Sequence, residues 1–445
     1  MTTDARSGRI VEVFVAEFGE LIALDPAAFR RKFRKMAASP FAFYRGSACL
    51  FYADLTSDHA DEAYLNQRTS RVWIHGDLHA ENFGTYMNAS GQLVFNVNDF
   101  DEAYVGPFSW DLKRFAASLA LIGYAKALSD DLIGDLVRRF ARAYLTELRA
   151  IASSGDEAIG SITLATATGV LRRVLQQARL HTRVDLLRAQ TAVDHYERRF
   201  SAGDGVFEVD EPTRAAVLAS FERYLKTLPP AVANSRPVAT NIKDVVMRKG
   251  VGIGSAGLPS YNLLLEGSTQ ALENDLIIYM KRAQVPAVAR HITDERVHGY
   301  FKHQGHRTAE SQRALQAHAD PWCGYTEFDG VGQFVAEVSP YSTDLDWADL
   351  NEPAEIAEVV ADLGGAVARM HAVAADSAGH DLVDFSTEEA IVAAVGTDDV
   401  GFTKGLVDFA HMYGAQVRSD HQRFVDLFRN NVVPGLSEAA TLADR

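Results

Sequence analysis

The chain has 445 residues, of which 47% are hydrophobic and 23% charged, as in ordinary globular enzymes, and it is long enough for one large core or two to three domains. Its formal net charge of −15 argues against general nucleic-acid binding, which relies on clustered Lys and Arg. The only cysteines, Cys49 and Cys323, exclude a disulfide framework and a thiolate zinc site, and they fit a reducing cytoplasm.

The first 40 residues predict helices, because apolar side chains recur at helical spacing from Ile10 to Phe18 and from Phe29 to Met36. The N-terminus lacks the basic and then apolar pattern of a signal peptide, and no stretch reaches the roughly 20 apolar residues of a membrane span. We therefore expect a soluble, intracellular protein. An aromatic-rich segment follows, in which Arg45 either reaches a substrate phosphate or carboxylate or pairs with a structural carboxylate.

Residues 74–102 carry most of the candidate chemistry. They begin IHGDLHAENFG, continue through an apolar strand predicted at Leu93 to Val97, and end on NDFDE. In kinases one Asp accepts the proton of the acceptor hydroxyl, an Asn five residues later holds a metal ion, and an Asp after the next hairpin holds Mg²⁺. Asp77, Asn82 and Asp99 have this spacing, and their oxygen atoms suit Mg²⁺.

His75 belongs to the same catalytic motif, and we expect it to pack and form hydrogen bonds beneath the site. A rival use of these residues is a zinc site, because His75, Asp77 and His79 form an H-x-D-x-H cluster. That use leaves Asn82 and the DFD turn without a role. The simplest alternative is a polar turn followed by a hairpin capped by Asp99.

The segments after this motif are predicted to be mostly helical. The spacing of apolar residues indicates one helix from Leu112 to Ile122 and a second helix beginning at Ser129. Residues 160–228 are also predicted to be helical. The proline-containing segment from Leu228 to Pro237 is the best candidate linker.

A glycine-rich loop is expected between strands at residues 245–247 and 261–265. It contains Gly252, Gly254, Ser255 and Gly257. A dinucleotide fold needs a helix to begin within such a motif, whereas here Pro259 and a strand follow. Strand, glycine loop and strand is the arrangement that covers ATP phosphates in kinases. A glycine-rich hairpin turn is the alternative.

The next predicted strand, from Leu276 to Lys281, ends on a lysine as in the V-A-I-K pattern of kinases. We expect Lys281 to hold the nucleotide phosphates. Its partner is predicted to be Glu310 on a following helix, with Glu295 as the alternative. A further strand at residues 331–341 and long helices at residues 356–371 and 402–428 complete the chain.

The order of these motifs is the reverse of that in ordinary kinases, because the HGD and DFD motifs precede the glycine loop and the strand lysine. Through HGDLHAENFG, NDFDEAYVGPFSWDLKRFAASL, GVGIGSAGL and ESQRALQAHAD, the chain resembles, over almost its whole length, the bacterial family called domain of unknown function 2252. It is more distantly similar to aminoglycoside and choline phosphotransferases. The resemblance implies a circularly permuted kinase-like fold. It also implies Asp77 as the base, Asn82 and Asp99 as metal ligands, Lys281 as the phosphate ligand and Glu310 as the partner of Lys281.

We therefore predict a two-lobed α+β protein. A helical catalytic part is formed by residues 1–237 and 346–445, and residues 238–345 form a β-rich nucleotide-binding part. The predicted cofactors are ATP and Mg²⁺.

The predicted activity is transfer of the γ-phosphate to a hydroxyl group of a small molecule. The gap between Asp99 and Trp110 is too short for the activation loop of a protein kinase, and Gly76 replaces the Arg of the HRD motif. We expect the helices after Ser129 and after Phe402 to wall the acceptor pocket. A nucleotide-binding pseudokinase or interaction protein and a nucleotidyl transferase remain alternatives. Neither nucleic acid nor membrane is an expected partner.

Overall fold

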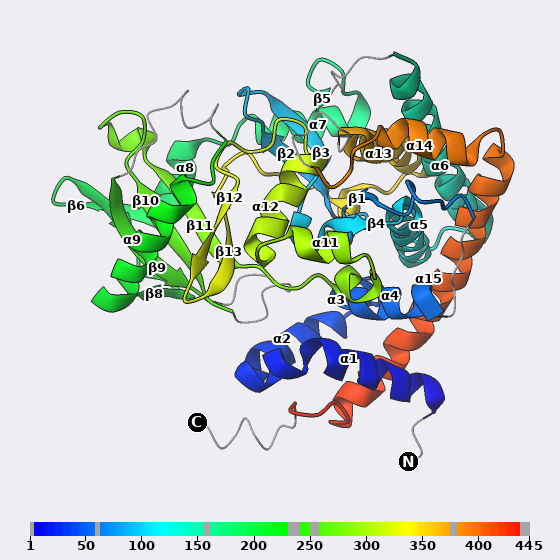
Figure 1. The fold of residues 1–445 in the computed structure, drawn as a ribbon, viewed down its shortest axis with the longest axis horizontal. Coiled ribbons are helices and arrows are strands. Elements are labelled where there is room, and N and C mark those ends of the chain that lie inside the picture. Colours follow the sequence, from blue (N-terminus) through cyan, green and yellow to red (C-terminus); the bar gives the residue numbers. More distant parts are fainter. Residues whose placement is uncertain are drawn as a thin grey trace.

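The computed structural model describes residues 4–57, 63–154, 161–229, 241–249, 258–373 and 381–436. In these ranges the chain has a mixed α+β fold, in which a helical part lies beside a part built on a six-stranded sheet (Figure 1). The predicted α+β class is confirmed. None of the described helices is both long enough and apolar enough to cross a membrane.

The helical part is built from both ends of the chain. Its N-terminal helices are α1 (Ala5–Leu24), α2 (Pro26–Met36), α3 (Pro40–Gly46) and α4 (Ala48–Ser57). Its central helices are α5 (Phe108–Ala125), α6 (Asp130–Ser154) and α7 (Gly169–Ala178). Its C-terminal helices are α13 (Pro353–Val373), α14 (Thr387–Val395) and α15 (Asp399–Arg429). Helix α6 packs along α13, and α15 packs along α5 and α6 and reaches α1 (Figure 1).

Short strands surround the HGD and DFD motifs. They are β1 (Val72–Ile74), β2 (Phe83–Met87), β3 (Leu93–Val97), β4 (Tyr104–Gly106) and β5 (Ile162–Thr163). Strand β1 pairs with β4. Strands β2 and β3 form an antiparallel hairpin, and β3 also pairs with β5, so that β3 is the central strand of a three-stranded sheet. Strand β3 has the predicted bounds.

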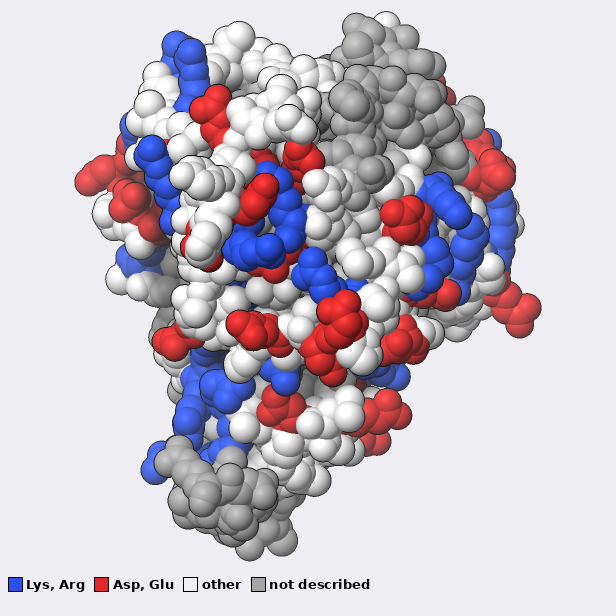
Figure 2. All heavy atoms as spheres, turned by 90° about the vertical axis from the view of Figure 1, so that its left-hand side faces the viewer, with Lys and Arg blue, Asp and Glu red and all other residues white. Residues whose placement is uncertain are grey.

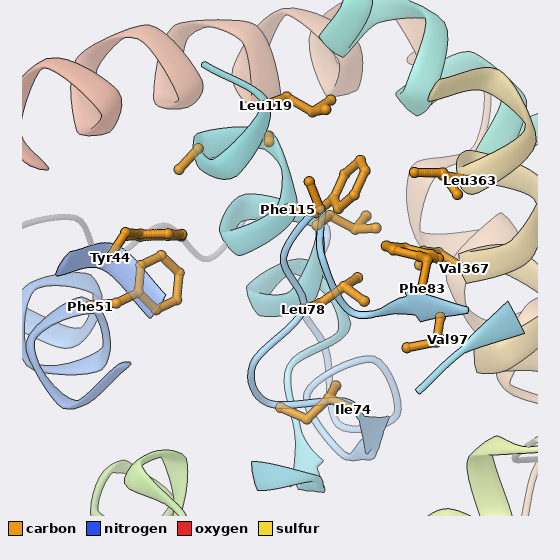
Figure 3. Close-up of a cluster of buried hydrophobic side chains, with 14 of the residues drawn as sticks. Tyr44, Phe51, Ile74, Leu78, Phe83, Val97, Phe115, Leu119, Leu363 and Val367 are labelled. Carbon is orange, nitrogen blue, oxygen red and sulfur yellow. The ribbon is translucent and has the colours of Figure 1, made fainter. Parts of the chain in front are cut away.

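The core of the helical part fixes the loop between β1 and β2. Leu78 in this loop is fully buried and lies toward Phe115 of α5, while Phe83 and Val97 of the hairpin lie beside Val367 of α13 (Figure 3). Burying each such side chain stabilises the fold by roughly 1.5–3 kcal/mol. The loop that carries the HGD motif is therefore anchored by its own apolar residue.

The sheet has the antiparallel strand order β12-β13-β11-β10-β9-β8. Its strands are β8 (Val206–Glu208), β9 (Ile242–Arg248), β10 (Ser260–Leu265), β11 (Leu276–Arg282), β12 (Gly324–Phe328) and β13 (Val331–Glu337). Helix α9 (Glu211–Leu225) covers one face with Val217, Phe221 and Tyr224. Helix α12 (Gln304–Leu315), preceded by α11 (Glu295–Tyr300), packs on the other face and lies between the sheet and the helical part (Figure 1).

The prediction of helix throughout residues 160–228 is wrong in part. Besides β5 and β8, this segment contains the hairpin β6 (Thr191–Asp194) and β7 (Glu197–Phe200), as well as helix α8 (Arg183–Gln190). The hairpin strands are largely exposed and charged, so they lack the alternating apolar residues that signal a strand. Because β8 joins the sheet, the β-rich part begins upstream of the predicted boundary at residue 238. Most of the predicted linker lies outside the described residues.

Candidate functional site

A polar face of α5 holds the loop that follows β1. Asp111 and Ser118 lie two helical turns apart on this face, and both are buried. The Asp111 carboxylate accepts hydrogen bonds from the backbone N–H groups of His75 (2.7 Å) and Gly76 (3.0 Å), and Ser118 Oγ accepts one from Ala80 N–H (3.1 Å). The backbone N–H groups of the loop thus form hydrogen bonds with side chains of α5, a helix that follows the loop in the chain.

Arg114, on the same face of α5, binds the proposed catalytic carboxylate. Its Nε donates to Asp77 Oδ1 (2.7 Å), and its Nη2 pairs with the same oxygen atom. The guanidinium is fully buried and stacks over the ring of Tyr44, 4.3 Å from the ring centroid. Asp77 Oδ2 lies 3.8 Å from Nε2 of His79, and the Asp77 side chain is 18% exposed. One carboxylate oxygen of Asp77 is therefore held, and the other is available at the cavity wall.

His75 supports the loop from beneath. Its Nε2–H donates to the carbonyl oxygen of Asn98 (2.8 Å), and its ring packs against Phe100, with centroids 5.3 Å apart. His75 is fully buried and does not line either cavity described below. The structure therefore places this predicted catalytic residue in a positioning role, linking the HGD loop to the DFD turn.

Gly76 has a backbone conformation that the local packing restricts to glycine. Its φ is +78°, and a Cβ atom at this position would overlap the carbonyl oxygen of Glu102. The side chain that an HRD motif would carry here therefore cannot be accommodated without movement of the DFD turn.

The β2–β3 hairpin brings Asn82 and Asp99 to the same end. Phe83 pairs with Val97, so the residues just outside this pair are neighbours. Asn82 Nδ2 donates to the carbonyl oxygen of Asp77 (2.9 Å), which leaves its side-chain oxygen without a hydrogen bond among the described residues. Asn82 is buried behind the cavity surface and lines neither cavity described below.

Asp99 has features of a cation ligand. Its backbone is left-handed, with φ +60° and ψ +71°, which is rare outside glycine and frequent at functional sites. Although Asp99 is exposed at the cavity wall, its partial desolvation there, followed by the neighbouring Asp101 carboxylate, raises the pKa of Asp99 above its ordinary value. Within the described residues the Asp99 carboxylate has no hydrogen bond or ion pair. An acidic group in this environment is stabilised by a bound cation.

Lys281 reaches the DFD turn from β11. Its Nζ lies 2.6 Å from Asp101 Oδ2. Burial lowers the pKa of Lys281, but Asp101, with smaller contributions from Tyr279 and Asp99, more than offsets burial and raises the pKa above its ordinary value. The ammonium group therefore stays charged beside the two carboxylates of the turn.

The predicted Lys281–Glu310 pair is not formed in this structure. Glu310 instead accepts a hydrogen bond from Arg313 Nη1 (2.9 Å), one turn later on α12. The physical reason is that Asp101 already occupies the position next to the lysine. Glu295, the other candidate, is exposed at the start of α11.

Helix α12 is tied to the DFD turn through Arg307. This buried guanidinium donates to the carbonyl oxygens of Ala103 (2.6 Å), Asp101 (2.8 Å) and Gln284 (3.0 Å). Burial lowers the pKa of Arg307 to about 10, since its partners are carbonyls rather than carboxylates. Arg307 thus connects α12, the DFD turn and the segment after β11.

Two cavities adjoin at the DFD turn. The one on the sheet side has a volume of about 720 Å³, and Asn262, Tyr279 and Lys281 line it. The other has a volume of about 500 Å³, and Asp77 and His79 line it together with residues of α1 and α2. The residues common to both linings are Arg45, Asp99, Asp101, Glu102, Arg282 and Gln284. Asp77 and Lys281 therefore lie on opposite sides of a shared acidic wall.

Three sequence predictions about these cavities have different outcomes. Gly252, Gly254, Ser255 and Gly257 lie outside the described residues, although Leu258 and Pro259 immediately after them line the sheet-side cavity. Arg45 pairs with Glu81 and also lines both cavities. The helices after Ser129 and Phe402, α6 and α15, contribute no residue to either of these cavities, and α1 and α2 line the Asp77-side cavity.

The zinc alternative has no support in the geometry. Across the described ranges, no group of three or more His, Cys, Asp or Glu side chains is arranged to hold a metal ion. His75 is occupied by the Asn98 carbonyl, and burial, followed by Arg45, lowers the pKa of His79 well below its ordinary value.

Sequence reasoning did not identify Arg114 or Arg307. It interpreted the run RRKFRK, residues 30–35, as a solvated face, with phosphate binding as the alternative, and Lys32 of this run lines the Asp77-side cavity. The i, i+3 spacing of Asp111 and Arg114 on a predicted helix was an available signal, because two charged residues on one helix face next to a catalytic motif suggest a common polar environment. Arg307 has no comparable local signal.

The fold and the site together define an α+β protein with a cleft, lined by carboxylates and cations, between a helical part and an antiparallel sheet. The chain belongs to the family described as "Uncharacterized protein conserved in bacteria (DUF2252)", whose sequence model matches residues 24–427. Comparisons with curated proteins and with solved structures gave no match.

Proposed function

We propose that this protein is a Mg²⁺- and ATP-dependent phosphotransferase with a circularly permuted kinase-like fold, and that it transfers the γ-phosphate of ATP to a hydroxyl group of a small molecule. The observation that carries the proposal is the pair of adjoining cavities, with Lys281 on one side of the DFD turn and Asp77 on the other. A triphosphate in the sheet-side cavity would point its terminal phosphate toward Asp99 and the Asp77-side cavity.

In the proposed reaction Asp77 accepts the proton of the acceptor hydroxyl through Oδ2. Arg114 holds Oδ1 and so orients the carboxylate. As the bond between the acceptor oxygen and the γ-phosphorus forms, the bond from that phosphorus to the bridging oxygen of ADP breaks. Lys281 offsets negative charge on the phosphates once it exchanges its contact with Asp101 for a contact with the nucleotide.

The donor set fits Mg²⁺. The free side-chain oxygen of Asn82 and the carboxylate of Asp99 are hard ligands, and Mg²⁺ commonly takes one or two protein ligands besides phosphate oxygens and water. Bound there, the ion would neutralise the phosphates and the clustered carboxylates of Asp99 and Asp101.

A small acceptor is supported by the short connection after Asp99. Only the 3-10 turn Phe100–Glu102 and strand β4 separate Asp99 from α5, and these residues are largely buried against the core. No segment of this connection is long enough to dock a peptide as the activation loop of a protein kinase does. The Asp77-side cavity of about 500 Å³ is within the range of small-molecule sites.

The permuted topology is supported by the order of the residues around the cleft. Asp77, Asn82 and Asp99 precede Lys281 by about 180 residues or more, yet Lys281 bonds to the DFD turn itself. The helical part combines both chain ends, as the permutation requires.

The decisive experiment compares nucleotide binding with transfer of label. Thermal unfolding of the purified protein is measured with ATP, with and without Mg²⁺, where ligand at about 1,000 times its dissociation constant stabilises by roughly 4 kcal/mol. We expect stabilisation that depends on Mg²⁺ and is lost in Asp99→Ala. The protein is then incubated with γ-labelled ATP and either a metabolite extract or a protein lysate, and label is expected in small molecules.

Other outcomes would identify the alternatives. Label found only in protein bands would contradict the small-molecule acceptor. Transfer from α-labelled but not γ-labelled ATP would indicate nucleotidyl transfer. Binding of Mg²⁺ and ATP without turnover would favour a pseudokinase, and absence of any stabilisation would refute the nucleotide site.

A further inference from the structure

Lys32 on α2 stands apart among the charged groups of the Asp77-side cavity. It is half buried, and its Nζ lies 4.3 Å from the centroid of Phe18 and 5.6 Å from that of Phe29. Within the described residues it has neither a hydrogen bond nor a carboxylate within ion-pair distance. The aromatic contacts stabilise the ammonium group by less than the removal of a charge from water costs.

Four of the six carboxylates that line the same cavity have partners, and the other two are Asp99, the proposed Mg²⁺ ligand, and Glu20, which is exposed. Glu17 pairs with Arg290 at 2.6 Å, Asp77 with Arg114, and Asp101 with Lys281. Glu102 accepts a hydrogen bond from the backbone N–H of Ala287 (2.7 Å). With Asp99 assigned to Mg²⁺, a ligand that brings an ammonium group would have to compete with these partners or pair with the exposed Glu20.

Two of the four cations that line this cavity have a carboxylate partner, and two have none in the part of the chain that the structure describes. Arg45 is paired with Glu81, but Arg282, exposed where the two cavities meet, has no carboxylate partner within the described residues. Lys32 is the more buried of the two unpaired cations. Glu17, Glu102 and Asp77 act on it electrostatically from beyond ion-pair distance, yet burial still lowers the pKa of Lys32 below its ordinary value. An anion bound beside Lys32 would offset the free energy lost when its charge is removed from water.

Apolar groups form much of the rest of the lining. Val15 and Leu21 of α1 and Val285 and Ala287 after β11 contribute to the wall. The ligand that matches this wall is compact, partly apolar and charged at one end.

We infer that the phosphoryl acceptor carries an anionic group, a carboxylate or a phosphate, that binds Lys32 while its hydroxyl reaches Asp77. This inference rests on the proposed function. It assigns the acceptor to the hydroxy acids or phosphorylated alcohols, in contrast to amino sugars and amino alcohols, whose positive charge would face Lys32.

The first test measures anion binding directly. Inorganic phosphate is titrated calorimetrically into the protein, both free and saturated with Mg²⁺ and a non-hydrolysable ATP analogue. We expect binding that weakens at least tenfold in Lys32→Met, which keeps an unbranched side chain over Phe18. Lys32→Arg should retain binding, and so should the control Arg34→Met, which removes an exposed cation from the same helix. Thermal unfolding checks that each variant is folded.

The second test uses a panel of acceptors with γ-labelled ATP. We expect transfer to hydroxycarboxylic acids or sugar phosphates, and we expect the KM of the acceptor to rise in Lys32→Met more than kcat falls. Transfer to amino sugars or neutral polyols that Lys32→Met leaves unchanged would overturn the inference.

The proposed function and the inference about Lys32 can be refuted independently of each other. If the ATP analogue does not bind, the proposed function is refuted, while phosphate titration of the free protein still decides whether Lys32 forms an anion site. Equal phosphate affinity in wild type and Lys32→Met would overturn the Lys32 inference even in a protein that binds Mg²⁺ and ATP.

Discussion

Asp77 combines a fixed position with access to the cavity. Arg114 holds one of its oxygen atoms, His79 lies near the other, and the backbone on either side is bound by α5. Such a carboxylate is suited to accept a proton from a bound hydroxyl, because its orientation is set before the substrate arrives.

We predict that Asp77→Asn lowers turnover by about 10²-fold to 10⁴-fold and leaves binding of Mg²⁺ and ATP nearly intact. The amide keeps an oxygen atom for Arg114 but cannot act as the base. Turnover is measured with an identified acceptor, and nucleotide affinity by calorimetry. Wild-type turnover in this variant would remove Asp77 from the mechanism.

Glu102 links the site to the pH dependence of stability. Burial, followed by the nearby Asp77 carboxylate, raises the pKa of Glu102 from 4.5 to about 7. Between these values the folded protein keeps a proton that the unfolded chain has lost. The free energy of unfolding should therefore fall as pH rises from about 4.5 to about 7, by at most ~1.4 kcal/mol per pH unit from this residue.

We predict that Glu102→Gln makes the free energy of unfolding less dependent on pH in that window. The amide still accepts the hydrogen bond from Ala287 N–H. Urea denaturation at several pH values gives the slope, with Glu12→Gln, exposed on α1, as the control. A slope equal to that of wild type would show that Glu102 does not hold its proton in the folded state.

At the scale of elements, α5 acts as the support of the site. Its polar face binds the HGD loop, and its apolar face lies in the core between α6, α13 and α15. The Asp111 carboxylate also accepts a hydrogen bond from His371 Nε2 of α13 (3.2 Å), whose Nδ1 accepts from the Tyr144 hydroxyl of α6 (2.8 Å). Helices from different parts of the chain thus hold one loop.

We predict that Arg114→Met destabilises the protein by about 3 kcal/mol, because removing one partner of a buried ion pair leaves the other charge uncompensated. The double variant with Asp77→Asn should lose less than the sum of the single changes. Chemical denaturation measures each free energy of unfolding. Arg138→Met, which breaks the exposed pair with Asp135, is the matched control and should cost at most about 1 kcal/mol. Equal losses for the two arginines would argue against a structural role for the Arg114–Asp77 pair.

At the scale of the whole molecule, the two chain ends meet in an aromatic cluster beside the Asp77-side cavity. Phe424 of α15 lies 5.8 Å from Phe14, 5.3 Å from Phe33 and 5.1 Å from Phe43, measured between ring centroids. This cluster fixes α1 and α2, which carry Lys32 and the apolar wall. On the outer surface, Figure 2 shows acidic and basic side chains interspersed over the upper and middle part of one face, with basic side chains gathered at its lower left.

We predict that Phe424→Ala lowers the free energy of unfolding by about 3–5 kcal/mol, the cost of removing a fully buried aromatic ring. Because the cluster positions α2, phosphate binding at Lys32 should also weaken. Val400→Ala, whose side chain is 81% exposed on the same helix, should change stability by less than about 0.5 kcal/mol. A loss below 1 kcal/mol for Phe424→Ala would mean that the two chain ends are not coupled through this cluster.

The sequence by itself determined the features that depend on local spacing. Periodicity located β3, β11 and the long helices α13 and α15, and the hairpin between Asn82 and Asp99 followed from residues that pair close together in the chain. Only the tertiary structure decided which distant groups meet. It gave Lys281 the partner Asp101 in place of Glu310, and it brought Lys32 of α2 into the wall that contains Asp77. Local periodicity reports which face of an element is buried, whereas such pairings depend on how whole elements pack against one another.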